Sequence, residues 1–361
     1  MSFLKNFRPR SIQVQLAAII VGIPVALLIA NIDYRDIAKA WKIYVPASYL
    51  LLLATFVIGE ARTTRLSAKR WLNIPIINIS VQPSEFLKLA FILSFAYHVY
   101  KTQDKLNHPV NILLLCVHAL IPIALVQLQG DSGTALMFAC IFLAMLFIAG
   151  IKAVYIIVAG VASPVIVLLA WNFLLSEMQK RRFLAILEPA STNADSTIFQ
   201  QSRAALAIGS GKLTGNGIFS DSHVYVPEIH NDFIFAFIGD ALGFLGCLAV
   251  IAVITLLCTK LLYNCVSAKD KQGQIICAGV FAMIFFQSAI NIGMCLSILP
   301  VIGNSLPFIS SGGSSILANY IGIGLALSVY KHTERRKVAD NFLPINGYPV
   351  IEWRPRDIGK Y

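Results

Sequence analysis

Residues 224–246, "VYVPEIHNDFIFAFIGDALGFLG", join a polar, turn-like segment to an apolar one, and a carboxylate stands at the boundary. Asp232 follows His230 closely, and apolar residues run almost unbroken from Phe233 to about Thr259. An acid beside water can stay ionised while an apolar flank raises its affinity for a proton, which suits a general base. Aspartate is also a frequent N-cap residue of helices, so a capping role is the alternative.

Other ionisable residues lie inside or at the mouth of apolar segments, where charge is costly and indicates function by default. In "VQPSEFLKLAFIL", Glu85 and Lys88 share one helix face. They form either a structural ion pair or part of a ligand site. Asp131, in "VQLQGDSGTALMF", lies between two apolar segments that are joined almost without a loop, and it serves either as a helix cap or as a binding residue. Asp240 lies about two turns inside an apolar segment, where its side chain needs either a partner or a proton that neutralises it.

Two clusters of cations stand out in the loops, "EARTTRLSAKRWLNI" (60–74) and "SEMQKRRFLAILEP" (176–189). Both lie on the side that the topology below places outside, so they suggest an anionic ligand there; an ordinary solvated loop is the alternative. The candidates for binding the anion are Arg70, Lys180, Arg181 and Arg182.

The composition is that of a membrane protein. Of the 361 residues, 57% are hydrophobic and 13% are charged, and the mean hydropathy is +0.73. Soluble domains carry about 25% charged residues, and a membrane-spanning helix needs about 20 mostly apolar ones. Nine apolar blocks approach that length: about 13–31, 43–59, 86–100, 110–128, 133–150, 153–172, 233–259, 275–299 and 316–330. We therefore predict an all-α, polytopic transmembrane helix bundle of about nine spans, with residues 1–361 as a single integral membrane domain.

The distribution of Lys and Arg predicts the orientation. Cations slightly favour the side that carries the C-terminal tail, 331–361, and the positive-inside rule makes that side cytoplasmic. Residues 173–231 then form a large extracytoplasmic loop, in which "QQSRAALAIGSGKLTGNG" predicts a short interfacial helix followed by a tight turn. Nine spans place the N-terminus outside, whereas Lys5, Arg8 and Arg10 favour the cytoplasm.

Read in order, the motifs resemble those of the SEDS family (shape, elongation, division and sporulation), which includes the RodA and FtsW proteins. The motifs are "AKRWLNI" (68–74), "QPSEFLKLA" (82–90), "QGDSGTAL" (129–136), "QSRAALAIGSG" (201–211), "PEIHNDFIFAFIGDALGFLG" (227–246), "NIGMCLSILPVIGNSLPFISSGGSS" (291–315) and "YKHTERRK" (330–337). The resemblance implies a peptidoglycan glycosyltransferase of the bacterial cytoplasmic (inner) membrane. Such enzymes polymerise lipid II, a disaccharide-pentapeptide on undecaprenyl diphosphate, and usually work with a class B penicillin-binding protein.

The resemblance also implies roles for single residues. The family's essential Asp falls on Asp232, its Glu and Lys on Glu85 and Lys88, its Trp after Arg on Trp71, and its Asp before Gly-Thr on Asp131. The matched motifs add five candidates for substrate binding: His230, Gln201, Ser202, Ser310 and Ser314.

This sequence also departs from the family pattern. Ser311 takes a position that is usually Tyr, and Asp240-Ala241 one that commonly holds two acidic residues. The family normally has ten spans, and the block 13–31 matches the second of them.

Three functions compete at this level. The favoured one is a lipid II polymerase of cell-wall elongation, RodA-like because of "PEIHNDF", although "LPFISSGGSS" leans toward FtsW. The others are a flippase for lipid-linked precursors and a non-catalytic scaffold for a penicillin-binding protein. Membrane lipids are expected as partners and nucleic acid is not. No cofactor is assigned; a divalent cation beside Asp232 stays open as an alternative, but no ligand cluster argues for one.

Overall fold

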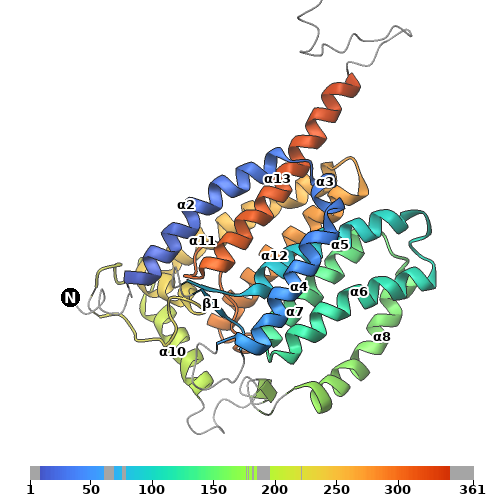
Figure 1. Cartoon of the computed structure of the whole chain (residues 1–361). Helices are drawn as coiled ribbons and strands as arrows, with labels where there is room; N and C mark the ends of the chain where they lie inside the picture. The colour runs from blue at the N-terminus through green and yellow to red at the C-terminus, as the bar shows by residue number, and fades with distance from the viewer. Residues whose placement is uncertain are drawn as a thin grey trace, which may run out of the picture.

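The computed structural model of the chain describes residues 9–60, 69–74, 79–175, 177, 179–180, 183–184, 196–220 and 222–341. It is a bundle of long helices (Figure 1), as predicted. In the described part of the chain, eight helices hold segments long and apolar enough to cross a membrane. These helices are α2 (Pro9–Asn31), α4 (Trp41–Ile58), α6 (Pro109–Leu128), α7 (Ser132–Ala149), α8 (Ala153–Leu169), α11 (Ile234–Ser267), α12 (Lys271–Cys295) and α13 (Gly313–Asn341). The protein is therefore a multi-pass membrane protein.

The predicted block 86–100 corresponds to a further long helix, α5 (Pro83–Thr102), which carries the charged residues of the "QPSE" motif. Shorter elements join these helices: α3 (Tyr34–Lys39), the 3-10 turn η1 (Gln103–Lys105), the π-helical turn η2 (Ala170–Leu174) and α10 (Ser196–Ser210). Helix α10 is the short helix predicted in the long loop. An antiparallel hairpin, β1 (Leu72–Ile74) and β2 (Ile79–Val81), was not predicted.

Helix α12 lies at the centre of the bundle, where it packs against α5, α7, α11 and α13. Most of its residues are buried, including several polar ones. Helix α8, by contrast, lies at the edge of the bundle, and its described residues are exposed or partly exposed. The polar side chains of α12 are therefore the ones that need partners inside the protein.

Helix α2 runs parallel to α13. Its first turns lie beside the loop that precedes α13, where Gln15 Nε2 donates to Ile309 O over 3.0 Å. At its other end, Ser328 Oγ donates to Ile32 O over 2.6 Å. The two helices approach closely because Gly324 has no side chain; a Cβ there would lie 2.8 Å from Ala26 O.

Helix α11 is broken at Gly243, a position that the sequence analysis treated as ordinary helix. Its φ of 66° suits glycine, and the break leaves backbone groups without helical partners. The long loop supplies them: Phe244 N donates to Lys212 O over 2.8 Å, and Asn216 N donates to Asp240 O over 2.9 Å. The break therefore persists in the membrane because 212–217 pairs with it like a strand.

Asp240 has the partners that the sequence required. Its carboxylate is fully buried and accepts hydrogen bonds from Ser210 Oγ at 2.9 Å and Asn216 Nδ2 at 2.7 Å. The Val224 N–H also donates to it, and His223 Nδ1 lies 3.0 Å away. Asp240 thus fastens the loop after α10 to α11.

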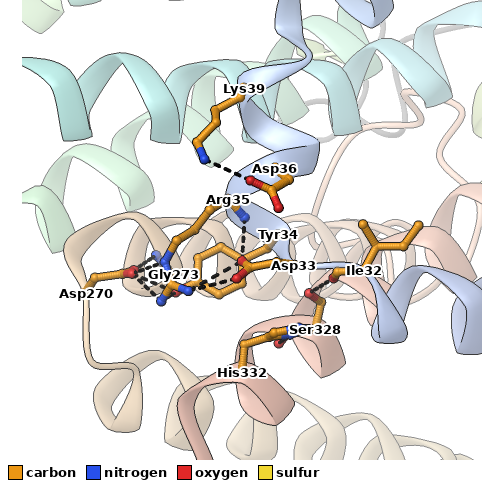
Figure 2. A network of polar contacts seen from close by, with 10 residues as sticks. All are labelled: Ile32, Asp33, Tyr34, Arg35, Asp36, Lys39, Asp270, Gly273, Ser328 and His332. Carbon is orange, nitrogen blue, oxygen red and sulfur yellow. Dashed lines mark hydrogen bonds and ion pairs between the residues drawn. The ribbon is translucent and has the colours of Figure 1, made fainter. Parts of the chain in front are cut away.

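A second polar cluster holds the opposite end of the bundle together (Figure 2). Asp270 is the N-cap residue of α12, and its Oδ1 accepts from Gly273 N over 2.8 Å. Its Oδ2 accepts from Tyr34 Oη over 2.8 Å and from Arg35 Nε over 2.7 Å. This carboxylate joins the α2–α3 connection to the start of α12.

Protonation of the Asp270 carboxylate weakens the hydrogen bonds and the ion pair that it forms with these residues. Burial by itself would raise the pKa of Asp270, but the hydrogen bonds from Gly273, Tyr34 and Arg35 and the Arg35 charge outweigh it and lower that pKa. A carboxylate with a lowered pKa stabilises the fold above its unfolded pKa of about 3.9, and this stabilisation is lost as the pH falls through the folded pKa.

We expect Asp270→Ala to lower the free energy of unfolding at pH 7 by about 1–3 kcal/mol, toward the lower end because solvent reaches part of the carboxylate. The difference from the wild type should shrink below pH 4. Thermal unfolding in detergent at several pH values measures both effects. Asp36→Ala is the control, since Asp36 and Lys39 pair in full contact with solvent. An equal loss of stability in the two variants would contradict the role of Asp270.

Candidate active site

Asp232 lies in the turn that precedes α11. Helix α11 begins at Ile234 and its N-cap residue is Phe233, so Asp232 is not the cap that the alternative reading required. Its side chain is partly buried. A Cβ on Gly303, an exposed residue of the loop between α12 and α13, would lie 3.5 Å from Asp232 Oδ2. The carboxylate therefore lies at an exposed edge of that loop.

The backbone around Asp232 is fixed by side chains from distant segments. His230 O accepts from Ser311 N over 2.9 Å and from Ser311 Oγ over 3.0 Å. Asn231 O accepts from Ser310 Oγ over 2.6 Å. Asp232 O accepts from Asn291 Nδ2 of α12 over 2.8 Å. Three consecutive carbonyls are thus held from outside their own turn.

Asp131 forms a second centre. It is the N-cap residue of α7, and its Oδ1 accepts from Thr134 N over 3.2 Å. The buried carboxylate also pairs with Arg70, whose Nη1 lies 3.3 Å from Oδ1, and accepts from Gln82 Nε2 over 3.1 Å. Capping and ion pairing therefore coexist at Asp131.

Trp71 follows Arg70 in the segment that leads into β1. Its backbone pairs with that of Glu60, with Glu60 N donating to Trp71 O over 2.8 Å. This pairing and the hairpin β1–β2 place Arg70 beside the start of α7. Arg70 also donates through Nη2 to Gly130 O.

The Asp131 and Asp232 centres are joined by α12 and by the start of α13. Gln82 N donates to Ser314 Oγ over 3.3 Å. The neighbouring Ser315 Oγ accepts from Gln287 Nε2 over 3.2 Å, and Gln287 also donates to Ser305 Oγ over 3.1 Å. Asn304 precedes Ser305, and its backbone oxygen accepts a hydrogen bond from Asn291, which also donates to Asp232 O. Segments far apart in sequence therefore form one continuous polar region.

Glu85 and Lys88 form an ion pair inside α5. Glu85 Oε1 lies 3.0 Å from Lys88 Nζ, and the residues are 6% and 1% exposed. Glu85 Oε2 is buried, and no described residue forms a hydrogen bond with it. Both residues lie within the first two turns of α5, whose N-cap residue is Gln82.

The remaining candidates lie in different settings. Gln201 is buried in α10, and its Nε2 donates to Leu299 O over 2.7 Å, which ties α10 to the loop after α12. Ser202 is exposed and donates to Phe199 O of its own helix. Lys180 pairs with Glu177 at 2.8 Å. Arg181 and Arg182 lie outside the described residues.

Sequence reasoning missed two residues that organise the site, Gln287 and Asn291. Both are fully buried in α12, one turn apart on one helix face. A signal existed, because two amides at this spacing interrupt the apolar block 275–299. Within the described ranges, no group of three or more His, Cys, Asp or Glu gathers as metal ligands would.

Comparison with known proteins identifies the family. A family model described as "Cell cycle protein", FTSW_RODA_SPOVE, matches residues 5–335 of this chain. The chain belongs to the FtsW/RodA/SpoVE family. The family predicted from the ordered motifs is therefore confirmed.

Curated members of the FtsW/RodA/SpoVE family carry enzyme names. The "Probable peptidoglycan glycosyltransferase FtsW" of Geobacter sp. (strain M18) is 32% identical over 318 residues, which cover 86% of this chain and 83% of that protein. The "Peptidoglycan glycosyltransferase MrdB" of Escherichia coli (strain K12) is 30% identical over 327 residues, covering 88% and 85%. These names agree with the predicted enzyme class, a peptidoglycan glycosyltransferase.

A solved structure of similar fold comes from work described as "Structural coordination of polymerization and crosslinking by a peptidoglycan synthase complex". It aligns with a TM-score of 0.76 and 25% identity over 90% of each chain. The helical architecture of this protein is thus that of a chain from a peptidoglycan synthase complex.

We expect Asp131→Ala to destabilise the bundle more than Asp131→Asn does. Alanine removes the cap and leaves Arg70 without its carboxylate, for a loss of about 2–4 kcal/mol given that Arg70 keeps some contact with water. Asparagine keeps an oxygen for Thr134 N and loses only the charge. Thermal unfolding of both purified variants measures the difference. Equal stabilities would contradict the capping role.

Proposed function

We propose that this protein polymerises lipid II into glycan strands at the outer face of the bacterial cytoplasmic membrane, with Asp232 as the general base. The observation that carries the proposal is the position of the Asp232 carboxylate, at an exposed loop edge and on a backbone held by helix α12 and by the loop before α13. The family and the names of its curated members support the reaction class.

The chemistry requires one proton acceptor and one site for a leaving anion. A hydroxyl of the acceptor sugar attacks the anomeric carbon of the donor, forming the new C–O bond. Asp232 takes the hydroxyl proton, and the C–O bond to the undecaprenyl diphosphate breaks, so that the electron pair leaves with the diphosphate. A carboxylate that reaches water can then pass its proton to solvent, which restores the base.

Arg70 is the described cation best suited to the diphosphate. It lies beside Asp131 at the start of α7, and its Nε is buried without a hydrogen-bond partner among the described residues. Preorganised donors aimed at developing negative charge stabilise such a transition state. Lys180 adds a second cation in the nearby segment that Gln179 joins to Ser132. Arg70 would then bind the departing anion while Asp232 accepts the proton.

The lipid portion of the substrate suits a bundle whose helices present apolar faces to the membrane. A class B penicillin-binding protein is the proposed partner, because a solved complex of similar fold couples polymerisation to cross-linking. Between the two subtypes we propose the RodA-like role in cell-wall elongation, on the motif "PEIHNDF".

We expect Asp232→Asn to reduce lipid II polymerisation by at least about 100-fold, the contribution of a positioned general base. The fold should be retained, because asparagine has nearly the same shape. Purified protein is incubated with lipid II, with and without the penicillin-binding protein, and the glycan ladder is separated on a gel. Asp36→Asn is the control, because Asp36 lies in the cluster at the start of α12 (Figure 2), whereas Asp232 is held near the end of that helix.

The same assay separates the competing functions. An unchanged ladder from Asp232→Asn would remove Asp232 as the base. Vesicles that move labelled lipid II across the membrane without making a ladder would favour the flippase. A stable complex with the partner and no ladder from either variant or wild type would favour the scaffold.

A further inference from the structure

Asn291 occupies an unusual position in the bundle. It is fully buried in α12, and its single amide group donates two hydrogen bonds, to Asp232 O over 2.8 Å and to Asn304 O over 2.6 Å. An amide nitrogen carries two hydrogens, so both are used. One side chain therefore joins three segments: α12, the turn before α11, and the loop 299–312.

The neighbouring turns of α12 extend this contact. Four residues earlier, Gln287 donates to Ser305 of the same loop. Four residues later, Cys295 Sγ lies 3.8 Å from Asp232 O, which therefore receives contacts from two α12 side chains. Residues at this spacing share one helix face. That face of α12 supports both the loop and the turn.

The geometry leaves the Asp232 carboxylate few ways to move. Asn291 holds the Asp232 carbonyl, and Ser310 and Ser311 hold the two preceding carbonyls, so side chains from two other segments fix the backbone that carries the carboxylate. Gly303, whose Cα faces the carboxylate, belongs to the loop that Asn291 also holds through Asn304 O. Asn291 thus fixes the base and the edge beside it relative to each other.

We infer that Asn291 is a positioning residue for the reaction: it holds the base Asp232 at the orientation and distance that proton transfer from the acceptor hydroxyl requires. The inference rests on the proposed function, since it assigns Asn291 a role through Asp232. Catalytic groups must be held within a fraction of an ångström, and a displacement of about 1 Å can cost about 100-fold in rate.

The test uses Asn291→Leu, which has a similar volume and no donor. We expect kcat for lipid II polymerisation to fall about 10- to 100-fold, with KM within about twofold of the wild type because Asn291 touches backbone and not substrate. Gln272→Leu is the matched control. Gln272 is also buried in α12, but at the opposite end, and its Nε2 has no hydrogen-bond partner within the described part of the chain. The rate of the Gln272→Leu variant should therefore equal that of the wild type.

The same substitution made in the Asp232→Ala variant separates a positioning role of Asn291 from a general effect on stability. If Asn291 acts through Asp232, then Asn291→Leu should cause no further loss in Asp232→Ala. An equal loss of rate in both backgrounds, or a wild-type kcat in Asn291→Leu, overturns the inference. Should leucine prevent folding, Asn291→Ser is measured by the same criteria, because its short hydroxyl cannot reach both carbonyls. A wild-type rate in Asp232→Ala would instead refute Asp232 as the base. That result concerns the proposed function and is distinct from the two results that overturn the role of Asn291.

Discussion

Polar groups buried in a membrane-spanning bundle must find their hydrogen-bond partners within the protein, because hydrocarbon offers none. In this protein the constraint is met mainly on α12. Gln287 and Asn291 lie toward the C-terminal end of this central helix, and their donors reach a loop, a turn and the start of α13. The hydrogen bonds that satisfy the donors of these buried amides therefore also hold in place the segments that carry the candidate site.

The two ends of the bundle show the same solution with different chemistry. At one end, neutral amides and hydroxyls hold backbone carbonyls around Asp232. At the other end, the Asp270 carboxylate accepts hydrogen bonds from Tyr34, from Arg35 and from Gly273 in the first turn of α12 (Figure 2). Helix α12 is therefore anchored at both ends, and a helix held in this way is a suitable support for the proposed base.

Carboxylates in this chain divide by what surrounds them. Asp131, Asp240 and Asp270 each accept hydrogen bonds through the carboxylate that tie separate segments together. Asp232 differs in its setting, because side chains from other segments hold its backbone and its carboxylate lies near the exposed Gly303. This setting is the basis of the proposal that Asp232 acts as the general base.

The sequence by itself determined the helical membrane architecture, the helix in the long loop, the boundary position of Asp232 and the family. These features are local, since hydropathy and motif order are read along the chain. Only the tertiary structure decided that Asp131 both caps α7 and pairs with Arg70, that α11 breaks at Gly243, and that Asn291 holds Asp232. Each of these depends on a hydrogen bond between residues far apart in sequence, and such partners become known only when the helices are packed.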